Sequence, residues 1–128
     1  MAVEITNNTI LKPCSTSPHP LTNTLVPLTI FDRVAMDLHV PTIYAFRAPM
    51  PSNSDLEQGL AKVLAHYPHL SGRMVVDDEH GQPCFILNNA GVRLIETRVC
   101  ATLAEKLPLE CTTELANLHP PVEGTYVM

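Results

Sequence analysis

The sequence predicts an α+β fold, and three observations support this class. Residues 54–66 have the apolar spacing of an amphipathic helix. Twelve prolines against five glycines place frequent breaks between elements. Short β-prone runs recur along the chain, at residues 3–11, 40–48, 73–76, 84–87, 92–99 and 122–128.

The first third of the chain is predicted to alternate between strands and loops. Residues 3–11 alternate loosely between apolar and polar side chains and end near a proline, which predicts an edge strand. Residues 13–27 carry four prolines among Ser, Thr and Asn, which favours a loop fixed by proline. Residues 28–34 are expected to return to the interior. Residues 40–48 are rich in β-branched and aromatic side chains, which predicts an interior strand.

The main helix is predicted at residues 54–66. Ser54 and Glu57 match a capping box, in which serine accepts a backbone N–H and the glutamate reaches back to the cap. Pro68 disfavours helical geometry at the residue before it and ends the helix. One stripe of the helix surface should be apolar, formed by Leu56, Leu60, Val63, Leu64 and Tyr67.

The second half of the chain predicts short strands joined by turns. Residues 73–76, 84–87 and 92–99 are extended candidates separated by turn-forming residues, so a hairpin or a three-strand meander is expected. Residues 102–107 predict a short helical turn. Residues 122–128, after two consecutive prolines, predict a further strand.

Composition and charge exclude several classes of protein. The net charge is −5 and no basic cluster occurs, so neither nucleic acid nor an anionic membrane is an expected partner. No secretory signal and no apolar run of about 20 residues is present, which favours a cytoplasmic protein. The four cysteines lack metal-ligand or disulfide spacing and are expected to be reduced thiols: Cys14, Cys84, Cys100 and Cys111.

The six histidines do not form a recognisable site. Pro68 breaks the helix between His66 and His69, so a metal-binding pair is not expected there. Two prolines hold the backbone extended between His119 and Glu123, which favours a loop over a base with its orienting acid. His19 and His80 have no acidic or thiol partner at ligand spacing, and a nucleophile elbow and a glycine-rich phosphate loop are both lacking.

Three charged residues interrupt apolar or turn segments: Asp32, Arg33 and Arg73. Such charges are usually structural. We expect either a buried ion pair or a carboxylate that accepts backbone N–H bonds and fixes a loop.

Four blocks of the sequence resemble the plant acyl-CoA-dependent acyltransferases of the BAHD family. Residues 60–73 read Leu-Ala-Lys-Val-Leu-Ala-His-Tyr-Pro-His-Leu-Ser-Gly-Arg, similar to the family's Leu-x-x-x-Leu-x-x-Tyr-Pro-x-Leu-x-Gly-Arg block. Residues 27–32, 42–47 and 88–96 resemble other family segments in the same order. The matching motif residues are Asp32, Tyr67, Pro68, Gly72 and Arg73.

The resemblance implies an incomplete fold. Residues 1–128 would form the N-terminal part of the first of two chloramphenicol-acetyltransferase-like domains, each a mixed sheet packed by helices. None of the six histidines begins the family's catalytic His-x-x-x-Asp motif, and no tryptophan is present for its Asp-Phe-Gly-Trp-Gly block. The catalytic loop and the second domain are therefore expected to be absent.

The resemblance also implies a function for the full-length enzyme. An acyl group, hydroxycinnamoyl or benzoyl, would pass from acyl-CoA as co-substrate to an alcohol or amine acceptor, with no bound cofactor and no metal. His39, Thr42 and Tyr44 would line the acyl or acceptor pocket, although they fit equally well as ordinary strand residues.

Two hypotheses follow for this chain. The first is the N-terminal portion of such an acyltransferase, inactive alone. The second is a truncated, non-catalytic product that pairs an exposed strand edge with a partner. In either case unpaired strand edges and an apolar helix stripe predict poor solubility for the isolated polypeptide.

Overall fold

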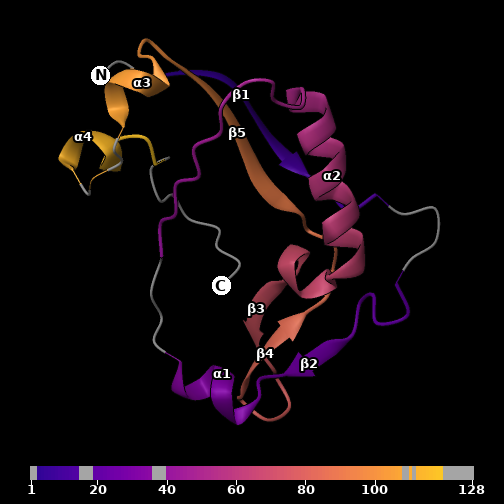
Figure 1. Ribbon diagram of the computed structural model, residues 1–128. Helices are drawn as coiled ribbons and strands as arrows, with labels where there is room; N and C mark the ends of the chain where they lie inside the picture. The colour runs from indigo at the N-terminus through magenta and orange to yellow at the C-terminus, as the bar shows by residue number, and fades with distance from the viewer. Residues whose placement is uncertain (1–2, 15–18, 36–39, 108–109, 111, 120–128) are drawn as a thin grey trace.

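The structure, a computed structural model, describes residues 3–14, 19–35, 40–107, 110 and 112–119 (Figure 1). It confirms the predicted α+β class: two small antiparallel sheets are combined with short helices and one long helix. In one sheet β1 (Val3–Leu11) pairs with β5 (Val92–Val99). In the other, β4 (Pro83–Ile86) lies between β2 (Leu25–Pro27) and β3 (Arg73–Val76).

The β1–β5 pair runs from Val3 opposite Val99 to Leu11 opposite Val92, with an irregularity between Ile5 and Asn7. β5 is the only described strand that pairs with β1, and most of β1 is exposed, so the edge-strand prediction is confirmed for the described residues.

The β3–β4 hairpin is also confirmed, but the three-strand meander is wrong. β5 pairs with β1 and not with β4. β4 pairs with β3 on one edge and with β2 on the other, where Val26 lies opposite Phe85. The residues before β5 explain this difference, because Asn89 and Gly91 have positive φ angles of 51° and 88° and turn the chain away from the hairpin. Residues 25–27 were predicted to be part of a loop, but they form the short strand β2 on the edge of β4.

Helix α2 (Asn53–His66) begins near the predicted position but uses another cap. Ser52, not Ser54, caps the helix: its Oγ accepts from the Asp55 N–H at 3.1 Å, and the Asp55 carboxylate accepts from the Ser52 N–H at 3.2 Å. The earlier start places Asn53 in the first turn, where its Nδ2 donates to Glu96 on β5 at 2.9 Å. This bond joins the start of α2 to the β1–β5 pair.

The apolar stripe of α2 is only partly covered. Leu64 is 1% exposed and Ala61 is buried, whereas Leu56, Val63 and Tyr67 are exposed. The described core is too small to cover the whole stripe, so part of this apolar surface is exposed. The buried apolar side chains are Leu28, Ala61, Leu64, Cys84 and Leu87.

A short 3₁₀ helix, η1 (Pro68–Ser71), follows α2 and is bound to the loop before β5. Ser71 is fully buried; its Oγ donates to the Pro68 carbonyl at 3.1 Å, and its own carbonyl accepts from the Gly91 N–H at 3.0 Å. Arg73 Nη1 donates to the carbonyls of Gly72 at 2.6 Å and Gly91 at 2.9 Å. We call residues 68–73 together with Gly91 the Gly91 junction.

Residues 28–34 differ from their predicted interior position. Leu28 is buried, but α1 (Ile30–Val34) is a short exposed helix, with Phe31 80% exposed. A local cap decides this: the Asp32 carboxylate accepts from the Thr29 N–H at 2.8 Å, and the Thr29 Oγ1 accepts from the Asp32 N–H. Asp32 is thus the predicted carboxylate that accepts backbone N–H bonds.

The predicted short helix near residue 103 is confirmed as α3 (Leu103–Lys106), and a second, α4 (Thr113–Ala116), follows it. The strand predicted at residues 122–128 lies outside the described residues.

Alanine at Gly91 is expected to destabilise the protein. An added Cβ would lie 2.5 Å from the Leu11 carbonyl oxygen, and φ is 88°. We expect a loss of about 2 kcal/mol or more in the free energy of unfolding, measured by urea denaturation. Gly59→Ala is the matched control: nothing lies within 4 Å of its Cβ position in α2, so it should stabilise by about 0.5–1 kcal/mol. Equal midpoints for the two variants would contradict the role of Gly91.

Arg73→Met should also destabilise the Gly91 junction. The change leaves two carbonyls without their donor in a partly buried place, so we expect a loss of about 1–3 kcal/mol in the same denaturation experiment. Arg93→Met serves as control because Arg93 makes one exposed bond, Nε to Asn8 at 3.2 Å. The control should change stability by less than about 0.5 kcal/mol.

Acid should loosen the start of α2. The side chain and backbone N–H of Ser52 donate to Asp55 and hold its pKa below the ordinary 3.8. A lowered carboxyl pKa stabilises the fold above the unfolded value, and this stabilisation is lost as pH falls through the folded value, below 3.8. Far-UV circular dichroism during acid titration should show helix loss in that range. Asp55→Asn should reduce it, and Asp78→Asn, in the exposed hairpin turn, should not.

Candidate functional site

The candidate site is centred on residues 40–47, where the structure corrects the predicted interior strand. These residues form no described strand, and their backbone groups make no hydrogen bond with one another or with another described residue. Val40, Tyr44 and Phe46 are 79%, 78% and 64% exposed. The composition is that of a strand, but no described strand lies alongside to provide the ladder that the segment needs.

An open hollow of about 290 Å³ lies beside this segment, and we call it the α3 hollow. Residues 43–46 contribute to its lining, and so do the end of β5, α3 and α4. Its lining residues are Ile43, Tyr44, Ala45, Phe46, Val99, Ala101, Thr102, Leu103, Lys106, Leu115 and Leu118.

The α3 hollow is mainly apolar. Among the described residues that line it, Lys106 is the only charged one, and its Nζ contacts Glu114 at 2.7 Å. The hydrogen bond and positive charge of Lys106 lower the pKa of the Glu114 carboxyl, and the two side chains have opposite charges. The hollow therefore suits an apolar or aromatic group and not an ion.

A second hollow of about 310 Å³ shares Phe46 and Leu103 with the first, and Arg47 lines it. Tyr44 and Phe46 stack on the same side of the extended segment, with ring centroids 6.5 Å apart and an interplanar angle of 29°. Residues two apart in an extended chain point to the same side. The two rings thus form one aromatic surface.

The structure gives a different result for each of the three residues that were predicted to line a pocket. Tyr44 lines the α3 hollow. Thr42 is exposed and is not part of that lining. His39 lies outside the described residues. Sequence reasoning did not select Phe46, although its spacing of two from Tyr44 places both rings on one side of an extended segment.

The residues that match the family motif lie in helix caps, at a helix end and in the Gly91 junction. Asp32 caps α1, and the side chain and backbone N–H of Thr29 lower its pKa. Tyr67 ends α2, with its N–H donating to Val63 at 2.9 Å. Pro68, Gly72 and Arg73 belong to the Gly91 junction, and none of the motif residues lines the α3 hollow.

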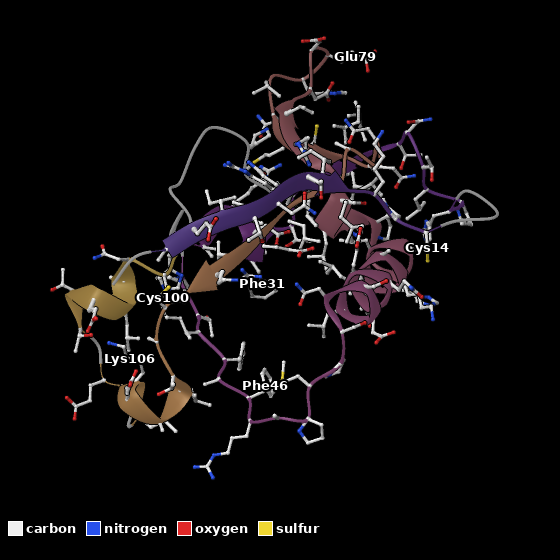
Figure 2. The ribbon with its side chains drawn as sticks, turned by 90° about the horizontal axis from the view of Figure 1, so that it is seen from above. Cys14, Phe31, Phe46, Glu79, Cys100 and Lys106 are labelled. Carbon is white, nitrogen blue, oxygen red and sulfur yellow. The ribbon has the colours of Figure 1, made fainter. Side chains whose placement is uncertain are left out.

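One histidine has an acidic partner that sequence reasoning missed. His80 Nδ1 lies 2.6 Å from Asp77 in the turn of the β3–β4 hairpin. The backbone N–H of Glu79, and then His80, lower the pKa of Asp77. The His80 side chain is 69% exposed, and Figure 2 shows Glu79 of the same turn at the opposite side of the molecule from Phe46. The pair therefore cannot act on a molecule in the α3 hollow.

Two further histidines, His66 and His69, lie at the end of α2 and in η1. His69 packs edge-on against Phe85, with ring centroids 6.1 Å apart, and His66 is exposed at the end of α2. Within the described ranges, no three His, Cys, Asp or Glu side chains gather as metal ligands. None of the described helices has the length and apolar character needed to cross a lipid bilayer.

Known proteins similar to this chain are plant acyltransferases. Tryptamine hydroxycinnamoyltransferase 2 of Oryza sativa subsp. japonica is 44% identical over 124 residues, which cover 96% of this chain and 28% of the relative. Agmatine hydroxycinnamoyltransferase 1 of the same species is 46% identical over 81% of this chain and 23% of the relative. Agmatine coumaroyltransferase-1 of Hordeum vulgare is 36% identical over 94% of this chain and 28% of the relative.

The chain thus spans less than a third of the length of these relatives. A sequence model described as "Transferase family" matches residues 1–126, almost the whole chain. The chain therefore belongs to the Transferase family, that of the plant BAHD acyltransferases.

Proposed function

We propose that this chain provides the N-terminal part of an acyltransferase that moves a hydroxycinnamoyl or benzoyl group from acyl-CoA to a small amine or alcohol. One observation supports this most strongly: 44% identity with a tryptamine hydroxycinnamoyltransferase over 96% of the chain. Amine acceptors are favoured because tryptamine and agmatine appear in the names of the relatives.

The contribution of the chain to this reaction is proposed to be a binding wall. The apolar α3 hollow, with Tyr44 and Phe46 along one side, suits an aromatic acyl group, since aromatic rings stack favourably on one another. Tyr44 also has a hydroxyl group that can bind a polar substituent. Thr42 and His39 are proposed to contact substrate next to it in the assembled enzyme.

The chemistry itself needs a general base that this chain does not contain. A base within about 3 Å of the acceptor proton contributes about 10²- to 10⁴-fold to the rate. No histidine here begins a His-x-x-x-Asp motif, and Figure 2 shows Glu79, the neighbour of His80 in the chain, on the opposite side of the molecule from Phe46. We therefore propose that the 128-residue chain is inactive alone.

A chimera tests this proposal. Residues 1–126 of this chain replace the matching part of tryptamine hydroxycinnamoyltransferase 2, and the product formed from a hydroxycinnamoyl-CoA and tryptamine is measured by mass spectrometry. We expect turnover by the chimera and none by the isolated chain. Tyr44→Ala in the chimera should raise KM for the acyl donor about tenfold, because a stacking ring is lost.

Phe31→Ala is the matched control, because Phe31 is an equally exposed aromatic residue on α1 outside both hollows. It should leave KM unchanged. Turnover by the isolated chain that disappears in His80→Gln would refute the proposal, and so would a folded chimera without activity.

A further inference from the structure

Two neighbouring hollows lie along α3 and meet at one pair of side chains. The α3 hollow, of about 290 Å³, and the hollow of about 310 Å³ that Arg47 lines are each lined by residues of the 43–48 segment and of α3. We call the second one the Arg47 hollow. Among the described residues, Phe46 and Leu103 are the two that line both hollows. Figure 2 shows Phe46 and Lys106, a residue of α3, at the same end of the molecule. The side chains of Phe46 and Leu103 therefore lie at the boundary between the two hollows.

The two hollows differ in the chemical groups that they suit. The α3 hollow carries the Tyr44 ring and mainly apolar side chains, so it suits an aromatic ring. Among the described residues that line the Arg47 hollow, Arg47 is the only charged one, and its guanidinium N–H groups can donate hydrogen bonds to oxygen atoms. Sites for small molecules usually measure about 300–1,000 Å³. Each hollow alone lies near the lower limit of this range, so an aromatic ring with large oxygen-bearing substituents needs both.

We propose that Phe46 is a specificity-determining residue, whose ring limits the size of the aromatic acyl group that the α3 hollow accepts. With Phe46 in place, the hollow takes a ring without bulky substituents, as in a benzoyl or monohydroxycinnamoyl group. Methoxy groups on the ring would have to pass between Phe46 and Leu103 into the Arg47 hollow, and the phenyl side chain opposes this. The inference rests on the proposed acyl-transfer function and adds which acyl groups are accepted.

The position of Phe46 separates this role from a structural one. Its side chain is 64% exposed and does not belong to the buried core, so its truncation should leave the fold intact. Its ring stacks on Tyr44 with centroids 6.5 Å apart, which places it next to the ring that the acyl group is proposed to contact. Removal of the phenyl group should join the two hollows and admit a larger acyl group. It should not improve binding of a small one, because the small group gains no new contact.

Acyl selectivity of the chimera with tryptamine hydroxycinnamoyltransferase 2 tests the proposal. Two thioesters are compared, coumaroyl-CoA and its analogue with two methoxy groups on the ring. Their Kd values are measured by isothermal titration calorimetry, and kcat/KM with tryptamine is measured on the same samples by mass spectrometry. The CoA part is common to both, so the ratio of the two Kd values reports on the acyl group alone. Phe46→Ala should shift this ratio toward the dimethoxy thioester by about tenfold.

Three further variants assign the effect to the boundary between the hollows. Leu103→Ala should shift the ratio in the same direction as Phe46→Ala, because Leu103 lines both hollows from α3. The double variant should add little to either single change, since one open boundary is enough and neighbouring residues couple. Phe46→Tyr keeps the ring and should keep the ratio of the original chimera. Phe31→Ala is the matched control, an exposed aromatic residue outside both hollows, and should also leave the ratio unchanged.

An equal loss of affinity for both thioesters in Phe46→Ala would indicate a structural role and overturn the proposal. An unchanged ratio, or the same shift in Phe31→Ala, would also overturn it. If the chimera does not fold, the 128-residue chain is titrated with the two free acids by ligand-observed NMR, and the same ratio decides.

The two measurements separate this inference from the proposed function. A folded chimera without turnover, in which Phe46→Ala still shifts the ratio of Kd values, rejects the proposed function alone. An active chimera in which the ratio does not shift rejects the role of Phe46 alone. A folded chimera that binds neither thioester rejects both.

Discussion

The hydrogen bonds around Gly91 are the constraint on which the described fold depends. Its N–H donates to the Ser71 carbonyl and its carbonyl accepts from Arg73, and a Cβ added to it would lie 2.5 Å from the Leu11 carbonyl oxygen. One residue thus connects η1, the start of β3 and the β1–β5 pair. Because buried backbone groups must be paired, these bonds fix the angle at which the chain leaves one sheet and enters the other.

This constraint divides the chain into a fixed part and an unpaired part. The fixed part comprises both sheets, α2 and η1, around a small core that includes Leu64 and Leu87. Thr42 and Tyr44, which are proposed to contact substrate, lie in the other part, where residues 40–47 make no backbone hydrogen bond with another described residue. A binding wall contributes to catalysis only when its side chains are held in one geometry. The candidate site therefore needs packing from outside the described residues, whereas the Gly91 junction does not.

The same division explains which features the sequence could predict. The end of α2 at Pro68, the β3–β4 hairpin and the edge strand β1 are encoded by nearby residues, and all three are found. Ser52-x-x-Asp55 and Ser54-x-x-Glu57 are both local capping patterns, and the structure uses the first. The bond from Asn53 to Glu96, 43 residues away, is not visible in the local pattern. The turn toward β1 depends on Gly91 meeting Leu11 across the fold. Tyr44 could be selected through family resemblance, but the hollow beside it required the placement of α3 and α4.

Residues 40–47 combine strand composition with an absence of described partners, and this combination has a physical explanation. Ordering the backbone of a residue costs about 1–2 kcal/mol, which cross-strand hydrogen bonds and side-chain burial must offset. Without a neighbour, the segment gains neither. A ladder would use the backbone groups in the plane of the sheet and leave Tyr44 and Phe46 projecting from one face. Strand pairing and substrate contact therefore use different atoms of the same residues, so the interaction that orders the segment would also orient its aromatic rings.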